Sequence, residues 1–316
     1  MTRLMLLLIC LLPCTLLIRP VCADDSPKKL TDEERKELDT KWLKLSNAGF
    51  KAYHSEEYTD AEKLFEAALE VARQLYPVTE FSEGHAQLAV SLNNLAYLYQ
   101  AQRKFTKAES LFLDALEMRK RLYKGDHPGV AQSTNSLASL YMTQGNYSKA
   151  ESLFLDALEM RKRLCKGDHP DVAQCLMSLA NLYKLQGNYA KAELFFRDTL
   201  EMRKRWYKGD HSNVAQSLND LAVLLHDQQK LIDAEPFYRD ALDVYKRILK
   251  GDHPSIAVVL YNLASLLNER GKLADAEALY RDALSMRQRL FKGDHPDTAK
   301  SLDKLAEQVV KSGTGA

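Results

Sequence analysis

The sequence KAESLFLDALEMRKRL runs from Lys107 to Leu122 and recurs without a change from Lys149 to Leu164, 42 residues further along the chain. The string Lys-Gly-Asp-His repeats at the same interval, with its glycine at Gly125, Gly167, Gly209, Gly251 and Gly293. Self-similarity at a fixed period of this size is typical of a repeat array. One structural unit is therefore copied along most of the chain.

Each period contains two helical patterns. In residues 125–166 the first apolar stripe is Val130, Thr134, Leu137, Ala138 and Tyr141, and the second is Tyr147, Ala150, Phe154, Ala157, Leu158 and Leu164. Gly145-Asn146 separates the stripes, and Pro128 suits the first turn of the first helix. Each period thus predicts a helix–turn–helix hairpin, and neither helix can bury its stripe alone, so neighbouring hairpins must stack.

Seven positions of this hairpin have the spacing of the tetratricopeptide repeat: Leu137, Ala138, Tyr141, Gly145, Ala150, Phe154 and Ala157. The period and the Gly-Asp-His-Pro linker resemble the kinesin light chain subtype of that repeat, which is also common in bacterial proteins. The resemblance covers residues 42–310. It implies an all-α, right-handed superhelical solenoid of about six hairpins plus a C-terminal capping helix.

The first 23 residues have the pattern of a secretory signal peptide. Arg3 precedes an apolar run over residues 4–18, which is shorter than the roughly 20 residues that span a membrane. Val21 and Ala23 suit cleavage after Ala23, with an uncleaved anchor as the alternative. We therefore expect a secreted or periplasmic protein with a polar lead-in over 24–41, the solenoid over 42–310 and a flexible tail over 311–316.

Composition argues against several kinds of activity. The chain has 44 Lys+Arg and 43 Asp+Glu, so it lacks the basic excess that is typical of nucleic-acid binders. No nucleophile–base pair, phosphate-binding loop or metal cluster is visible, so we expect no enzyme activity, catalytic residue, cofactor or metal. Cys165 and Cys175, the two cysteines beyond the signal, could pair in an oxidising compartment or remain free.

The linkers carry a repeated Asp-His pair, with the histidines at His127, His169, His211, His253 and His295. The linkers lie one whole repeat apart, whereas the ligands of a zinc ion all lie within about 2.3 Å of it. One Asp and one His in each linker therefore cannot complete a metal site. We interpret these residues as caps for the free N–H groups of the following helix.

Basic residues recur at the end of each second helix: Arg119–Arg121, Arg161–Arg163, Arg203–Arg205, Lys246-Arg247, Arg287 and Arg289. We favour helix-end electrostatics, with ion pairs Glu117–Arg121, Glu159–Arg163 and Glu201–Arg205 at a spacing of four residues. The alternative function is binding of an anionic surface or polysaccharide through this stacked basic edge.

The resemblance implies that the first helices of the hairpins line a concave groove that holds an extended peptide or a partner helix. The expected contact residues are Asn93, Tyr97, Gln132, Asn135, Met142, Gln174, Asn181, Lys184, Gln216, Asn219, His226, Tyr261 and Asn268. Amide side chains can pair with both N–H and C=O of a peptide. The cluster of Lys and Arg with which some family members clamp a C-terminal carboxylate is missing. We therefore expect a monomeric scaffold for a protein partner.

Overall fold

The computed structural model describes residues 29–291 and 295–313, and all regular secondary structure in them is α-helical. The helices are α1 (Asp32–His54), α2 (Tyr58–Leu75), α3 (Ala86–Ala101), α4 (Phe105–Leu122), α5 (Pro128–Thr143), α6 (Tyr147–Leu164), α7 (Pro170–Leu185), α8 (Tyr189–Tyr207), α9 (Ser212–Asp227), α10 (Leu231–Ile248), α11 (Pro254–Glu269), α12 (Leu273–Leu290) and α13 (Pro296–Gly313). The expected signal peptide, residues 1–23, lies outside the described residues.

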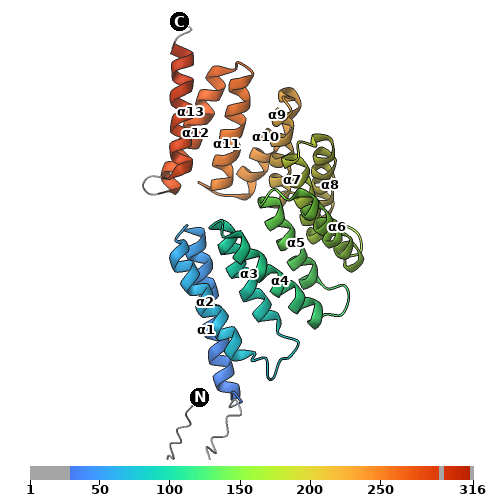
Figure 1. The fold of residues 1–316 in the computed structure, drawn as a ribbon. Helices are drawn as coiled ribbons and strands as arrows, with labels where there is room; N and C mark the ends of the chain where they lie inside the picture. Colours follow the sequence, from blue (N-terminus) through green and yellow to red (C-terminus); the bar gives the residue numbers. More distant parts are fainter. Residues whose placement is uncertain (1–28, 292–294, 314–316) are drawn as a thin grey trace, which may run out of the picture.

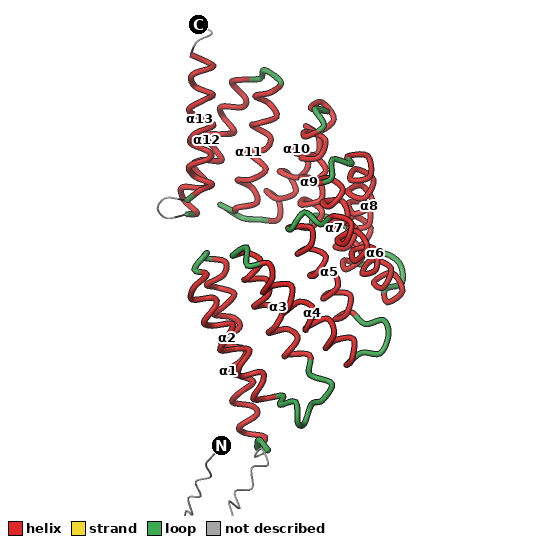
Figure 2. The backbone as a smooth tube through the Cα atoms, in the orientation of Figure 1, coloured by secondary structure: helices red, strands yellow, loops and turns green. Residues whose placement is uncertain are grey.

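Consecutive helices pack as antiparallel hairpins, from α1 with α2 to α11 with α12, and α13 covers the last of them (Figures 1 and 2). The predicted all-α solenoid is confirmed, with six hairpins and a capping helix in the described residues. Its first helix begins at Asp32, inside the segment expected to be a polar lead-in. Thr31 and Glu34 form a capping box there, which explains the early start. At the other end, α13 includes residues 311–313 of the expected tail.

The turn within each hairpin uses a left-handed residue. This residue is Gly145 in one copy, at a φ of 76°. Arg103 and Gln229 occupy the corresponding turns with φ values of 59° and 61°, although a side chain disfavours this region. Packing of the two helices therefore sets the turn even where glycine is missing.

The core is a continuous layer of small and large apolar residues between the helices. Ala138 and Ala180, on the first helices of their hairpins, are completely buried. Phe154 and Phe196, on the second helices, are at most 2% exposed. These residues belong to one cluster that extends from Ala52 to Ala283. The small residues let the helices of a hairpin approach closely while the aromatic rings fill the remaining space.

A buried arginine joins each of three hairpins to the next. Arg203 in α8 donates through Nη1 to the carbonyl of Asn213, at 3.0 Å, and to Oγ of Ser217 in α9, at 2.9 Å. Arg203 is only 5% exposed. The same pair of bonds recurs from Arg119 to Gly129 and Ser133 and from Arg287 to Asp297 and Ser301. We call this the arginine–serine contact.

Where one partner of this contact changes, the other changes or finds a new partner. Cys175 replaces the serine opposite Arg161, and Arg161 pairs with Asp171 instead. At the next variant junction the corresponding residues are Tyr245 and Val259, both buried, and the hydroxyl of Tyr245 donates to Gln216 at 3.2 Å. Each junction between hairpins is therefore complementary in its own way.

In the middle of the curved array, α5 and α7 lie on the inner side and α6 and α8 on the outer side (Figure 1). Three pairs of consecutive odd helices contact each other, namely α3 with α5, α5 with α7 and α9 with α11. Side-chain hydrogen bonds also join them. Gln100 in α3 donates to Thr143 in α5 at 2.9 Å, and Asn262 in α11 donates to Asn219 in α9 at 3.2 Å. Closer spacing of the odd helices than of the even ones bends the array toward the odd side.

Replacing Ala180 by leucine should destabilise the chain, because Ala180 is 0% exposed and overpacking a filled core costs about 1–3 kcal/mol. A urea titration measures this loss in the free energy of unfolding. Ala190→Leu is the matched control, since Ala190 is exposed in the first turn of α8. Equal stability of Ala180→Leu and the unaltered chain would contradict the packing described here.

Transplanting the Tyr245–Val259 pair into the junction between α8 and α9 tests the arginine–serine contact. Ser217→Val alone removes an acceptor from the buried Arg203, and an unpaired buried polar group costs about 1–3 kcal/mol. Arg203→Tyr with Ser217→Val should lose less free energy of unfolding than the sum of the two single variants, by more than about 0.5 kcal/mol. Additive losses in the same titration would show that the two residues are not coupled.

Candidate functional site

We define the inner face as the exposed and half-buried side chains of α3, α5, α7, α9 and α11. The structure brings the predicted groove residues together along this face, but it gives them different surroundings. Gln132, Gln174 and Gln216 occupy the same position in three successive repeats, and all three are exposed. Asn181 and Tyr97 are also exposed, with Tyr97 at 38%.

Three predicted groove residues are buried, and for these the sequence-based expectation of a ligand contact is corrected. Asn93, Asn219 and Tyr261 are between 5% and 9% exposed. Asn93 donates to Oγ of Ser133 at 3.4 Å, and Asn219 accepts from Asn262. These side chains point toward the neighbouring odd helix, so they stabilise the packing of the repeats instead of facing a partner.

Other predicted residues link neighbouring odd helices at the rim of the face. Lys184 pairs with Asp227 at 2.8 Å, and Nε2 of His226 lies 3.0 Å from Oε1 of Glu269. Tyr97 hydrogen-bonds with Ser136. Asn135, Met142 and Asn268 are half-buried, and Oδ1 of Asn135 is buried without a hydrogen-bond partner. Among the exposed glutamines, Gln132 accepts from Arg119 at 3.5 Å, and Gln216 donates to Asp220 and accepts from Tyr245. The face therefore combines internally paired groups with the free amides of Gln174 and Asn181.

Charge is almost absent from the inner face. α3 and α5 contain no Asp, Glu, Lys or Arg, whereas α4 alone contains seven. The charged residues of the remaining inner helices are Asp171, Lys184, Asp220, Asp227 and Glu269. Asp220 accepts from Gln216 at 2.7 Å, and burial raises the pKa of its carboxyl group. Each of these five side chains has a partner within the protein.

A cavity of about 410 Å³ lies at the turn end of the inner face, between α1, α3 and α5. It is lined by Tyr53, Tyr97, Gln100, Ala101, Arg103, Ser139 and Thr143. Tyr53, Arg103 and Thr143 were not among the residues expected from the sequence. They come from the loosely matching first repeat and from helix ends, where the repeat pattern is weakest.

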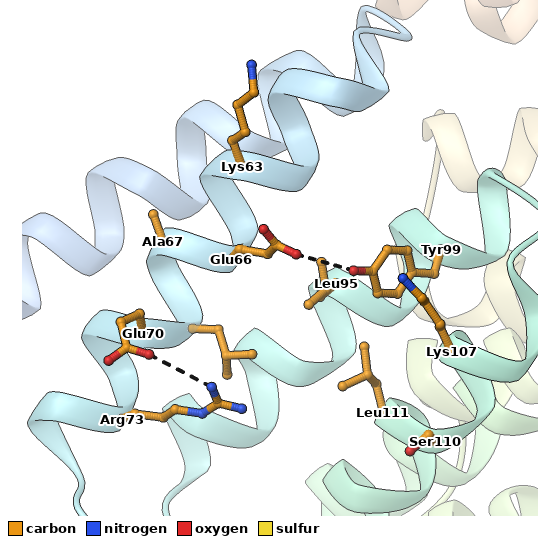
Figure 3. Close-up of a pocket in the computed structure, with 11 residues that line it drawn as sticks. Lys63, Glu66, Ala67, Glu70, Arg73, Leu95, Tyr99, Lys107, Ser110 and Leu111 are labelled. Carbon is orange, nitrogen blue, oxygen red and sulfur yellow. Dashed lines mark hydrogen bonds and ion pairs between the residues drawn. The ribbon is translucent and has the colours of Figure 1, made fainter.

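A larger hollow of about 810 Å³ lies on the outer side, between α2, α3 and α4 (Figure 3). Tyr99 there donates to Glu66 at 3.4 Å, and Lys107 lies 5.1 Å from the centre of the same ring. The same three-residue arrangement recurs as Tyr141, Glu109 and Lys149 and as Tyr183, Glu151 and Lys191. Burial, followed by the neighbouring glutamates, raises the pKa of the three tyrosines to about 12. This repetition indicates a joint between hairpins.

The linker histidines cap the odd helices, as predicted. Nδ1 of His85, His127, His169, His211, His253 and His295 accepts a hydrogen bond from the backbone N–H two residues later, at 3.0–3.2 Å. A capping Nδ1 must be unprotonated in order to accept. Three of these rings, those of His127, His211 and His295, also stack on the aromatic residue four positions earlier. The ring centres of His127 and Tyr123 lie 3.4 Å apart.

The basic edge is neutralised differently from what the sequence suggested. Arg163 donates to Asp126 in the preceding linker at 2.9 Å, and Glu159 pairs with Lys162 three residues away instead. The expected pairs at a spacing of four residues are therefore wrong. The same arginine–linker pairing recurs as Arg205–Asp168, Arg247–Asp210 and Arg289–Asp252, and these arginines hold the pKa of each aspartate below its usual value. With these arginines paired and Arg119, Arg203 and Arg287 buried, the edge offers few free charges to an anionic surface.

Cys165 and Cys175 are both free thiols. Cys175 is buried, and burial raises the pKa of its thiol to about 11. In the described parts of the chain, no three His, Cys, Asp or Glu side chains gather where they would hold a metal ion. None of the described helices combines the length and apolar composition needed to cross a membrane.

The sequence matches a family profile over nearly the whole array. The profile is that of the tetratricopeptide repeat, and it matches residues 87–163, 132–205, 195–247, 213–289 and 255–308. The chain belongs to the tetratricopeptide repeat family. The resemblance seen in the repeat positions is thereby confirmed. No curated protein matches the sequence.

Solved structures with the same fold include kinesin light chain-like repeat proteins. BtubC (BKLC) from P. vanneervenii is 24% identical, with a TM-score of 0.64, over 76% of this chain and 94% of that one. A putative kinesin light chain from Podosopora anserina is 18% identical, with a TM-score of 0.56, over 66% and 99%. A Rap protein complexed with Competence and Sporulation Factor is 15% identical, with a TM-score of 0.58, over 90% and 81%. At these identities the likeness concerns the tetratricopeptide fold alone.

The free energy of unfolding should depend on pH through His85, which lies in the first linker. Burial lowers the pKa of His85, with Arg35 adding to the effect and Asp39 opposing it. Above about pH 6.5 both folded and unfolded His85 are neutral and the cap is intact. As the pH falls below that value the unfolded chain binds the proton first, so the free energy of unfolding decreases.

Asparagine also caps helices but does not titrate. His85→Asn should therefore lose less stability than the unaltered chain between about pH 7.5 and pH 5.5, as measured by urea titration at each pH. His54→Asn, at an exposed histidine in α1, controls for the loss of a histidine elsewhere. An unchanged pH dependence in His85→Asn would exclude His85 as its source.

Proposed function

We propose that this tetratricopeptide repeat protein is a non-catalytic adaptor that acts outside the cytoplasm as a monomer and holds an extended segment of a partner protein on its inner face. The observation that carries the proposal is the row of exposed amides along that face. Gln132, Gln174 and Gln216 recur at one position per repeat and are exposed, and Asn181 lies beside them on α7. Gln174 and Asn181 keep their side-chain amides free, whereas Gln132 accepts from Arg119 and Gln216 is bonded to Asp220 and Tyr245.

The chemistry of this row suits a polypeptide backbone. Each amide offers a carbonyl oxygen and two N–H donors, and an extended peptide has unpaired N–H and C=O groups along its length. Because backbone groups are the same in every sequence, such a row provides affinity, and the apolar residues between the amides provide selectivity.

Two further features support a protein partner. The family fold is commonly a protein–protein interaction scaffold. The similar Rap protein was solved in complex with Competence and Sporulation Factor, so an array of this fold can hold a second molecule. The location outside the cytoplasm rests on the signal-like sequence of residues 1–23.

Site-specific photo-crosslinking tests which face meets the partner. A crosslinking amino acid placed at Asn181 on the inner face should capture a partner from the extracytoplasmic fraction. The same amino acid at Ser152, exposed on α6, is the matched position on an outer helix. Equal capture from both positions, or capture from Ser152 alone, would remove the inner face as the binding site.

Affinity for the captured partner provides a quantitative check. Gln174→Ala with Asn181→Ala removes two side-chain hydrogen-bond groups that the protein does not use internally, at about 0.5–1.5 kcal/mol each. We expect Kd to rise at least about fivefold, as measured by calorimetry. Ser148→Ala with Ser152→Ala on α6 is the control pair and should leave Kd unchanged, since both residues are exposed on an even helix. An unchanged Kd in the inner-face pair would contradict the proposal.

A further inference from the structure

The inner face differs from the rest of the protein in charge, and this difference constrains its partner. α3 and α5 carry no charged residue at all, although the neighbouring α4 and α6 carry seven each. The segregation continues into α7, whose only charged residues are Asp171 and Lys184, whereas α9 and α11 contribute Asp220, Asp227 and Glu269.

Both charges on α7 are already paired within the protein: Lys184 pairs with Asp227 at 2.8 Å, and Asp171 pairs with Arg161. On α9 and α11, Asp220 accepts from the neutral amide of Gln216 and Glu269 lies 3.0 Å from the imidazole of His226, so acidic groups remain at that end. Along α3, α5 and α7 a charged side chain of a partner would therefore lose its hydration without gaining an unpaired opposite charge, which is unfavourable.

The width of this stretch sets the length of the segment that it can hold. α3, α5 and α7 are three successive odd helices, and packed helices are about 10 Å apart. An extended chain rises about 3.3 Å per residue, so about three partner residues separate one helix from the next. About six residues reach from α3 to α7.

We infer that the inner face of α3, α5 and α7 selects a partner segment of about six or more consecutive uncharged residues, bound in extended form through hydrogen bonds and apolar contacts instead of ion pairs. This inference rests on the proposed function and adds the chemical class of the partner. It separates this protein from arrays that hold charged tails, because the side chains of α3, α5 and α7 carry no unpaired charge.

Arg103 tests whether recognition of the partner segment depends on charge. It is exposed in the turn after α3, lines the 410 Å³ cavity at the end of the inner face and forms no ion pair among the described residues. If recognition depended on charge, Arg103 would be the group that supplies it. If recognition is uncharged, Arg103→Gln leaves binding intact.

A phage-displayed library of random linear peptides of about 12 residues is the probe, with the purified mature chain as the target. We expect enriched peptides to contain an uncharged run of about six or more residues and to be depleted in Asp, Glu, Lys and Arg relative to the library. Enrichment of acidic or basic peptides would overturn the inference while leaving the proposed groove function standing. No enrichment over the empty support would count against the proposed function itself.

The best selected peptide is then synthesised and its Kd measured against variants and salt. Between about 0.05 M and 0.5 M NaCl we expect Kd to change less than about twofold, since screening acts only on charge interactions. Arg103→Gln should leave Kd unchanged, Gln174→Ala with Asn181→Ala should raise it at least about fivefold, and Ser148→Ala with Ser152→Ala should not alter it. A Kd that rises tenfold with salt, or is lost in Arg103→Gln, would show recognition by charge. Circular dichroism confirms that each variant is folded.

Discussion

The structure depends on burial between hairpins. No helix here can bury its apolar stripe within its own hairpin, so each hairpin needs the next, and the core is continuous from Ala52 to Ala283. This requirement also decides where polar groups go. Arginines enter the junctions where acceptors receive them, as a serine and a backbone carbonyl receive Arg203 and Asp171 receives Arg161. Tyrosine and valine take over at Tyr245 and Val259.

Much of this architecture could be predicted from the sequence because the repeat pattern reports packing directly. The hairpins, the capping helix and the capping role of the linker histidines all follow from residues that recur at one position per period. The start of α1 was missed, because its capping box at Thr31 and Glu34 precedes any recognisable repeat residue. The partners of the basic edge were missed for another reason. A sequence shows the glutamate four residues from Arg163, but the aspartate that binds it lies 37 residues earlier, in another linker.

The candidate site, like the fold, could be predicted from the sequence only in part. Its general position on the odd helices follows from the repeat, but the sequence cannot separate a side chain that faces outward from one that faces the adjacent helix. Gln132 and Asn135 are three residues apart on α5, yet Gln132 is exposed while the position of Asn135 is buried in two other copies, at Asn93 and Asn219. Whether a side chain at one of these positions is buried depends on how closely the adjacent odd helix approaches it, and that distance is set by the curvature of the whole array. Charge is easier to predict, since α3 and α5 lack it entirely.

The arginine–serine contact also affects how such a chain can grow. A segment from one linker to the next carries its serine near the start and its arginine near the end, as residues 125–166 carry Ser133 and Arg161. In the following copy Cys175 takes the place of the serine. A duplicated segment is therefore complementary to itself head to tail, and an array can lengthen by tandem duplication without redesign of its junctions. Open-ended association of separate molecules would follow from the same complementarity. Here Trp42 takes the place of an arginine and donates to Ser91 at the first junction, whereas α13 receives Arg287 through Ser301. The last described junction thus keeps the contact of the middle ones, and the first junction uses a different donor.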